Sequence, residues 1–146
     1  MIDAIDLTDC AVFVTWSTDT VRYGDLDPNL HVNNGAINQF FEDGRVHFRQ
    51  ACLSSTDGDK LTGFAVVKFS VIYRAPANYP GTVEIGTVVT RVGGSSYELG
   101  QGVFQDGSCV ATAEVVTVHF DPGTSTSKPL PEDIRAALVR MMAGTK

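Results

Sequence analysis

The chain has 146 residues, of which 43% are hydrophobic and 19% charged, a balance typical of one globular domain with a real core. Its net charge of -6 disfavours nonspecific binding to nucleic acid and to an anionic membrane surface. No stretch approaches the roughly 18 consecutive apolar residues that a membrane span requires. The first residues lack the basic start and apolar core of a signal peptide. We therefore expect a single cytoplasmic domain over residues 1–146.

The cysteines give no sign of a disulfide framework or a metal site. Cys10, Cys52 and Cys109 are odd in number, widely separated and free of any C-x-x-C pair. The three histidines show no zinc-ligand spacing with one another or with the cysteines. We expect the cysteines to be small buried hydrophobic side chains in a reducing compartment.

The N-terminal half predicts a strand, a polar junction and a long helix. Residues 11–23 alternate β-branched and aromatic side chains, which indicates a strand. The polar junction covers residues 25–34. From residue 34 to 52, apolar side chains recur at helical spacing of three and four residues. These side chains belong to Ala36, Ile37, Phe40, Phe41, Gly44, Phe48, Ala51 and Cys52. Asn33 or Asn34 can serve as the N-cap.

The C-terminal half predicts an antiparallel sheet and a short helix. A polar loop over residues 54–60 precedes four runs rich in Val, Thr, Ile and aromatic residues. Turn signals separate the runs, which cover residues 64–73, 81–92, 97–105 and 109–120. A short helix is predicted over residues 132–142, with Pro131 near its first turn. The order of elements favours a two-layer α+β domain, with the long helix packed on a mainly antiparallel five-stranded sheet.

Several enzyme signatures are absent from the sequence. It contains no G-x-S-x-G, no P-loop and no G-x-G-x-x-G. Asp25, Asp27 and Asn29 have the spacing that opens a calcium loop, but Leu30 occupies the required glycine position. Ala36 stands where the loop would need its bidentate glutamate. We therefore expect no bound metal.

The polar junction can be interpreted structurally or chemically. A helix start offers free backbone N–H groups and a positive dipole end, so a nearby carboxylate could work on a carbonyl group bound there. Alternatively, Asp25 and Asp27 form turns and caps, His31 is a hydrogen-bonded structural residue, and Asn33 and Asn34 are caps. The residue types alone leave both interpretations open.

Residues 21–34, Val-Arg-Tyr-Gly-Asp-Leu-Asp-Pro-Asn-Leu-His-Val-Asn-Asn, resemble the opening motif of the hot-dog fold acyl-CoA thioesterases. The resemblance is greatest to the 4-hydroxybenzoyl-CoA thioesterase branch. The predicted order of elements is also that of the family, and residues 73–77 resemble the family's bend after its second strand. The resemblance implies a hot-dog fold and a thioesterase acting on an acyl- or aroyl-CoA, without a cofactor.

The resemblance also assigns roles to residues of the junction. Asp27 matches the family's catalytic carboxylate, and it would act as general base on water or as a nucleophile that forms a mixed anhydride. Asn34 falls where the family uses a backbone N–H to polarise the thioester carbonyl group. Asp25, His31 and Asn33 match motif positions and are expected to support the loop. Coenzyme A thiolate is a good leaving group, so no strong general acid is required.

The resemblance implies a homodimer or homotetramer whose site lies at a subunit boundary. Arg74 and Arg91 are the preferred candidates for contact with the coenzyme A phosphates, and Lys60 and Lys68 are further candidates. Alternating strand residues would place Lys68 and Arg74 on one face. The sparse basic residues also leave room for a carrier-protein-bound acyl substrate.

Two other interpretations of the resemblance compete with an Asp27 thioesterase. A noncatalytic acyl-thioester-binding protein would bind ligand without turnover. A hot-dog dehydratase would pair a histidine with a carboxylate across the dimer, but His31 lies in a different kind of motif. Some hot-dog branches carry their carboxylate on the central helix, which makes Glu42 a necessary control. The acyl group could contact aromatic residues, although core packing is the favoured role for Phe40, Phe41, Phe48 and Phe64.

Overall fold

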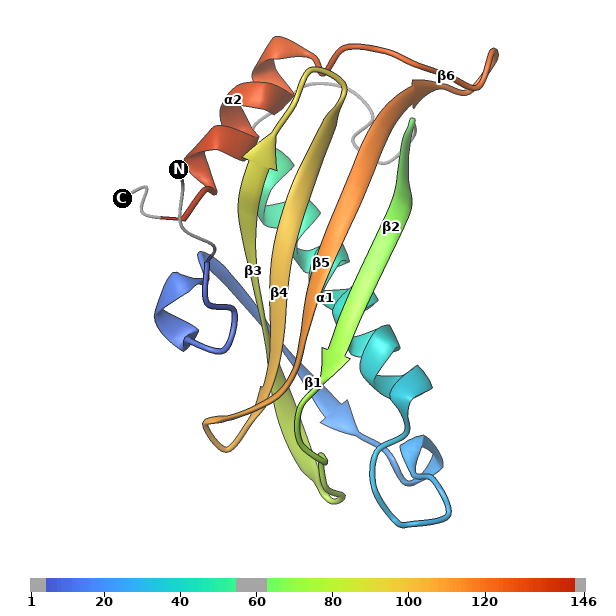
Figure 1. Ribbon diagram of the computed structural model, residues 1–146, viewed down its shortest axis with the longest axis vertical. Coiled ribbons are helices and arrows are strands. Elements are labelled where there is room, and N and C mark those ends of the chain that lie inside the picture. The colour runs from blue at the N-terminus through green and yellow to red at the C-terminus, as the bar shows by residue number, and fades with distance from the viewer. Residues whose placement is uncertain (1–4, 55–62, 144–146) are drawn as a thin grey trace.

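The computed structural model describes residues 5–54 and 63–143, which form one antiparallel sheet with two α-helices (Figure 1). The sheet order is β1-β3-β4-β5-β2, and a short strand, β6, pairs with β5. The strands are β1 Thr15–Val21, β2 Phe64–Tyr73, β3 Gly81–Val92, β4 Ser96–Gln105, β5 Ser108–Asp121 and β6 Thr126–Ser127. The helices are α1 Asn34–Leu53 and α2 Glu132–Arg140, with 3-10 turns η1 Cys10–Val12 and η2 Tyr23–Asp25.

The predicted α+β fold is confirmed, with small differences at the boundaries. Strands β2 and β3 have the predicted bounds, and β4 and β5 each begin one residue earlier than predicted. The first strand is shorter than residues 11–23, because a 3-10 turn precedes it and another follows it. The second helix ends at Arg140 rather than at residue 142. The two-residue β6 adds a sixth strand that the sequence did not indicate, and most of the predicted loop 54–60 lies outside the described residues.

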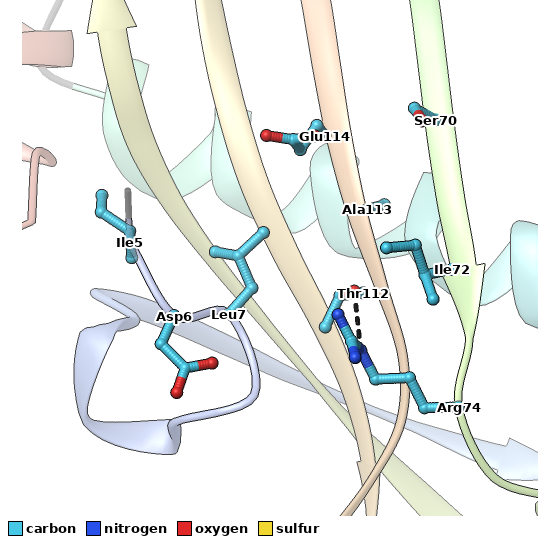
Figure 2. A pocket seen from close by; sticks show the side chains of 9 residues that line it. All are labelled: Ile5, Asp6, Leu7, Ser70, Ile72, Arg74, Thr112, Ala113 and Glu114. Carbon is cyan, nitrogen blue, oxygen red and sulfur yellow. Dashed lines mark hydrogen bonds between the residues drawn. The ribbon is translucent and has the colours of Figure 1, made fainter. Parts of the chain in front are cut away.

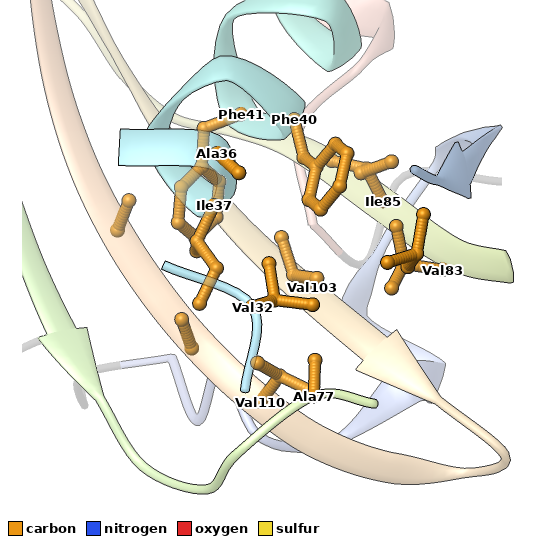
Figure 3. Packing of buried hydrophobic residues seen from close by; sticks show 13 residues of the cluster. Val32, Ala36, Ile37, Phe40, Phe41, Ala77, Val83, Ile85, Val103 and Val110 are labelled. Carbon is orange, nitrogen blue, oxygen red and sulfur yellow. The ribbon is translucent and has the colours of Figure 1, made fainter. Parts of the chain in front are cut away.

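Helix α1 packs its apolar face against the inner face of the sheet, chiefly over β1, β3 and β4. Near its N-terminus, Ile37, Phe40 and Phe41 are buried against residues of β3, β4 and β5 (Figure 3). Phe41 also meets Phe69 of β2 edge to face, with ring centroids 5.9 Å apart. Burial of one helix face against one sheet face gives the two-layer arrangement that the sequence predicted.

A buried glutamine fixes α1 along the sheet. Gln101 of β4 is fully buried, and its Nε2 donates to the Phe41 carbonyl oxygen and to Thr87 Oγ1, both at 3.1 Å. Its Oε1 accepts a hydrogen bond from Arg45 Nη1 at 3.1 Å. The side chain amide is therefore satisfied only when α1 lies at one position relative to β3 and β4.

The N-terminal segment packs on the outer face of the sheet, where it lies directly against glycines of β3 and β4. A methyl group on Gly100 would lie 2.5 Å from Leu7 Cδ2, and one on Gly86 would lie 2.5 Å from Phe13 Cγ. Phe13 and Phe104 meet edge to face, with ring centroids 5.8 Å apart. The absence of side chains on these glycines thus allows residues before β1 to pack directly on the sheet.

The expectation for the cysteines holds only in part. Cys52 is buried, and burial raises the pKa of its thiol to about 11, so this thiol stays protonated at neutral pH. Cys109 is half-buried, and burial raises its pKa as well. Cys10 is exposed because the η1 turn lies at the surface, so the prediction of burial is wrong for this residue. Neither of the two described α-helices is long and apolar enough to cross a membrane.

Gly44 provides a test of the contact between α1 and the sheet. A methyl group at Gly44 would lie 2.5 Å from Ile85 Cγ2 and 3.2 Å from Gln101 Nε2. Helix propensity favours Gly44→Ala by about 1 kcal/mol, but overpacking at this distance opposes it. We expect a net loss of about 1–3 kcal/mol in the free energy of unfolding, measured by denaturant titration.

Gly94→Ala is the matched control, because a methyl group at Gly94 would meet no atom within 4 Å. We expect its effect to stay within about 0.5 kcal/mol. A Gly44→Ala protein as stable as the wild type would show that the helix is not held against Ile85 as described.

Candidate functional site

An open pocket of about 290 Å³ lies at the N-terminus of α1. The polar junction forms one side, the first turns of α1 form another, and the end of β2 with the chain after it forms the third. Its lining residues are Asp27, His31, Val32, Asn34, Ile37, Tyr73, Arg74, Ala75 and Pro76. The structure therefore brings Asp27, His31 and Asn34 together with the segment that follows β2.

Asp25 does not line this pocket and has an architectural role. Its side chain is part of the η2 turn, and the residue is only 7% exposed. Oδ2 accepts a hydrogen bond from the Arg22 amide at 2.9 Å, and Oδ1 contacts Arg22 Nη2 at 3.3 Å. The Asp25 carbonyl oxygen accepts from the Asn33 amide at 2.7 Å. Asp25 thus connects the end of β1 to the start of α1.

Asp27 begins a tight loop that its own side chain holds. The Asp27 amide donates to the His31 carbonyl oxygen at 2.8 Å, and Oδ1 accepts from the amides of Asn29 at 2.8 Å and His31 at 3.1 Å. Leu30 reverses the chain with a φ of 62°. Oδ2 makes no hydrogen bond to any described residue. One carboxylate oxygen is therefore fixed by the loop, while the other is left for a ligand or water.

The helix start is capped by Asn33 rather than by Asn34. Asn33 Oδ1 accepts from the Ala36 amide at 2.7 Å, and the Asn33 carbonyl oxygen accepts from the Ile37 amide at 3.1 Å. The amides of Asn34 and Gly35 have no acceptor within residues 5–54 and 63–143. Two backbone donors at the positive end of a 20-residue helix therefore remain open beside the pocket.

His31 contributes its main chain to the loop and is one of the residues that line the pocket. Its imidazole is exposed and forms no hydrogen bond with the described part of the chain. The interpretation of His31 as a hydrogen-bonded structural residue therefore applies to its backbone and not to its ring.

The two preferred phosphate-contact candidates do not lie together. Arg74 follows β2, and its Nε donates to Thr112 Oγ1 at 3.1 Å on the outer face of the sheet (Figure 2). There it borders a second pocket of about 210 Å³, which Asp6 and Glu114 also line. Arg91 pairs with Glu98 at 3.2 Å near the far end of β3. Of the two arginines, only Arg74 lines the pocket that contains Asp27.

The remaining candidates lie away from the pocket lining. Lys68 is exposed and shares a strand face with Ser70 and Ile72 by alternation, so it borders the outer face. Lys60 lies outside the described residues. Glu42 is exposed on α1 and does not line the pocket. The four aromatic candidates are also outside the lining, in agreement with core packing: Phe40, Phe41, Phe48 and Phe64.

The sequence analysis did not identify two pairs of residues that the structure brings together at pockets. Tyr73 lines the pocket and donates a hydrogen bond to Asn38 Oδ1 at 2.7 Å, although the two residues are 35 positions apart. Asp19 of β1 and Asp43 of α1 both line a third pocket of about 380 Å³. Tyr73 could have been noticed because it opens the bend at residues 73–77, whereas no local pattern indicates its partner or the aspartate pair.

Asp43 perturbs the protonation of Asp19 in this separate pocket. Burial, and a hydrogen bond and charge repulsion from Asp43, raise the pKa of Asp19 from 3.8 to about 6. His47 and Arg22 oppose this shift, and His47 Nε2 lies 3.6 Å from Asp43 Oδ2. Among the described residues, no group of three or more His, Cys, Asp or Glu side chains could hold a metal ion.

Comparison with known proteins places these features in a family. A profile of the Thioesterase-like superfamily matches residues 21–138. The acyl-CoA thioester hydrolase YbgC of Escherichia coli O6:H1 is 30% identical over 123 residues, which cover 80% of this chain and 89% of that protein. The chain therefore belongs to the thioesterase-like superfamily.

Solved structures support the same assignment. A thioesterase from Thermus thermophilus, complexed with coenzyme A and Zn, is 28% identical and has a TM-score of 0.79. The match covers 89% of this chain and 95% of that one. A predicted thioesterase from Bacillus stearothermophilus has the same TM-score at 25% identity, covering 87% of this chain and 95% of that one. The predicted hot-dog fold and the predicted thioesterase class are thereby confirmed.

The raised pKa of Asp19 leads to a prediction of how the free energy of unfolding depends on pH. Because the folded state raises the pKa of Asp19 above 3.8, folding favours its protonated form, and stability is lost as the pH rises through about 6. Asp19→Asn removes this loss. We expect the variant to gain about 1 kcal/mol over the wild type at pH 7.5, after allowance for solvent screening, and less at pH 4.5.

Denaturant titrations at the two pH values measure this difference. Asp106→Asn, at an exposed turn, is the control and should show no such pH-dependent gain. An Asp19→Asn protein that is less stable than the wild type at pH 7.5 would contradict the described repulsion.

Proposed function

We propose that this protein hydrolyses the thioester of an acyl- or aroyl-CoA to a free carboxylic acid and coenzyme A. The observation that carries the proposal is one pocket lined by Asp27 and by Asn34, the first residue of α1. Support also comes from the relatives, since YbgC is named an acyl-CoA thioester hydrolase and the Thermus thermophilus thioesterase was solved with coenzyme A.

The open amides would bind the thioester carbonyl oxygen. As water or a carboxylate attacks the carbonyl carbon, negative charge develops on that oxygen. The amides of Asn34 and Gly35 lie at the positive end of α1, where they can donate hydrogen bonds to this charge without reorganising. The Asn34 side chain is exposed and is not needed for this step.

Asp27 would supply the carboxylate, through the oxygen that the loop leaves free. As general base, Oδ2 takes a proton from water while the water oxygen bonds to the carbonyl carbon and the thiolate leaves. As nucleophile, Oδ2 bonds to the carbonyl carbon itself, the C–S bond breaks and the coenzyme A thiolate leaves, and water then cleaves the mixed anhydride to the free acid and the Asp27 carboxylate. In both routes Oδ1 stays bound to the amides of Asn29 and His31, which keeps the carboxylate in place.

We also propose that a second copy of the chain pairs along β2. No described strand pairs with the outer edge of β2, and such an edge is a template for further pairing. Four large hydrophobic residues of this strand are exposed: Val66, Val67, Ile72 and Tyr73. Pairing there would put a second chain beside the pocket. Arg91 remains a proposed contact for the coenzyme A phosphates, although within one chain it lies at the far end of β3.

The other expectations remain part of the proposal. Residues 1–146 form a single thioesterase domain in the cytoplasm, and a carrier-protein-bound acyl group is the alternative substrate. Turnover of acyl-CoA without a carrier protein would separate these substrates.

Asp27→Asn tests the proposed chemistry. The amide oxygen can still accept the hydrogen bonds from Asn29 and His31, so the loop should stay folded while the base or nucleophile is lost. We expect kcat to fall by about 100- to 10,000-fold, with an unchanged thermal midpoint. The assay should follow thioester absorbance over short, long and aromatic acyl-CoAs, because exposed Cys10 would react with a thiol reagent.

Glu42→Gln is the matched control, since Glu42 is the exposed helix carboxylate outside the pocket. We expect it to keep wild-type activity. Loss of activity in Glu42→Gln but not in Asp27→Asn would show that Glu42 of α1, and not Asp27, supplies the carboxylate. A wild-type protein that binds acyl-CoA without hydrolysing it would instead be a binding protein.

Val67→Lys tests the second copy. Val67 is 62% exposed on β2, and a lysine on an edge strand discourages pairing with another strand. We expect the molar mass in solution to fall to that of one chain, measured by light scattering. Val139→Lys, at a 45% exposed position of α2, should leave the molar mass unchanged. A wild-type protein that is already monomeric would refute the proposed pairing.

A further inference from the structure

Tyr73 connects two walls of the pocket at the start of α1. It is the last residue of β2, and its hydroxyl donates to Asn38 Oδ1 at 2.7 Å. Asn38 lies four residues after Asn34, on the second turn of α1. The hydrogen bond therefore ties the end of β2 to the helix that carries the open amides.

The chain after Tyr73 is fixed on its other sides by backbone hydrogen bonds. The amides of Arg74 and Ala75 donate to the Val110 carbonyl oxygen at 2.8 and 3.1 Å. The Ala77 carbonyl oxygen accepts from the Val32 amide at 3.1 Å. This segment is thus attached to β5 and to the loop that follows Asp27, and the Tyr73 side chain supplies its link to α1.

The pocket between these walls is apolar where it borders the helix start. Ile37 and Val32 line it, and both belong to the buried cluster in Figure 3. Tyr73, a residue that is 41% exposed, completes this lining from the β2 side. A hydrocarbon or aromatic group could lie against these side chains while a carbonyl oxygen meets the amides.

We propose that Tyr73 and Asn38 form a positioning pair that sets the width of this pocket. This inference rests on the proposed thioester hydrolysis. The pair holds the end of β2 at a fixed separation from α1, so that the acyl group lies beside the Tyr73 ring and the carbonyl carbon lies within reach of Asp27. A hydrogen bond at a half-exposed position contributes little to stability, whereas a misplaced substrate loses rate.

Tyr73→Phe and Asn38→Ala test the pair as a double-mutant cycle. Phenylalanine keeps the ring and removes only the hydroxyl donor, and alanine removes the acceptor while favouring the helix. We expect each single variant to lower kcat about tenfold, with KM within about twofold of the wild type, because the loss falls mainly on the transition state. The double variant should be no slower than either single variant.

Tyr79→Phe is the control, because Tyr79 is a 44% exposed tyrosine on the next loop whose hydroxyl bonds to no described residue. It should keep kcat within about twofold. Thermal midpoints and molar masses of all variants should match the wild type, so that a change in kcat reports position rather than folding or assembly.

Three results would overturn the inference. One is wild-type kcat in Tyr73→Phe. Another is a double variant whose loss is the product of the two single losses, which would mean independent residues. The third is a fall in kcat that follows a fall in thermal midpoint. If Asp27→Asn is inactive while the cycle shows no coupling, only the positioning pair fails. If the wild type hydrolyses no thioester, the proposed function fails, and this inference fails with it.

Discussion

The position at which α1 begins depends on one short hydrogen bond, from the Asn33 amide to the Asp25 carbonyl oxygen at 2.7 Å. Asp25 is itself held by Arg22, so the end of β1 and the helix start form one unit. The loop between them is closed by Asp27, and the residue that donates the bond, Asn33, caps the helix. The same few contacts therefore place both the candidate carboxylate and the open amides.

This unit would not fix the position of the helix start if α1 could slide over the sheet. Contacts in the core prevent such sliding. Gln101 satisfies its buried amide with the Phe41 carbonyl oxygen, Thr87 and Arg45 at once. A shift of α1 would leave these polar atoms unpaired in the interior, which is unfavourable. Gly44 allows the close approach to Ile85 that the arrangement needs. The helix start is thus fixed from the loop side and from the sheet side.

The sequence predicted features that are set locally, and it missed those set by distant residues. The bounds of β2 and β3 followed from runs rich in Val, Thr, Ile and aromatic residues between turn signals, and the helix followed from its apolar spacing. The ends of β1 did not, because capping by Asp9 and Asp25 competes with extension of the strand. The Tyr73–Asn38 and Asp19–Asp43 contacts join separate elements, and the position of Arg91 depends on the length of β3. No local pattern carries such information.

The polar groups of the motif at residues 21–34 divide into two sets, one used by the architecture and one free for the proposed chemistry. Both oxygens of Asp25, Oδ1 of Asp27 and Oδ1 of Asn33 are used by the loop and the cap. Oδ2 of Asp27 and the amides of Asn34 and Gly35 have no partner in the described structure. Asn34 and Gly35 are exposed and Asp27 is half-buried, so all three groups are open to water or to a ligand. A carboxylate oxygen can take a proton or attack carbon, and two amides can hold an oxyanion. The proposed thioester hydrolysis would use this combination.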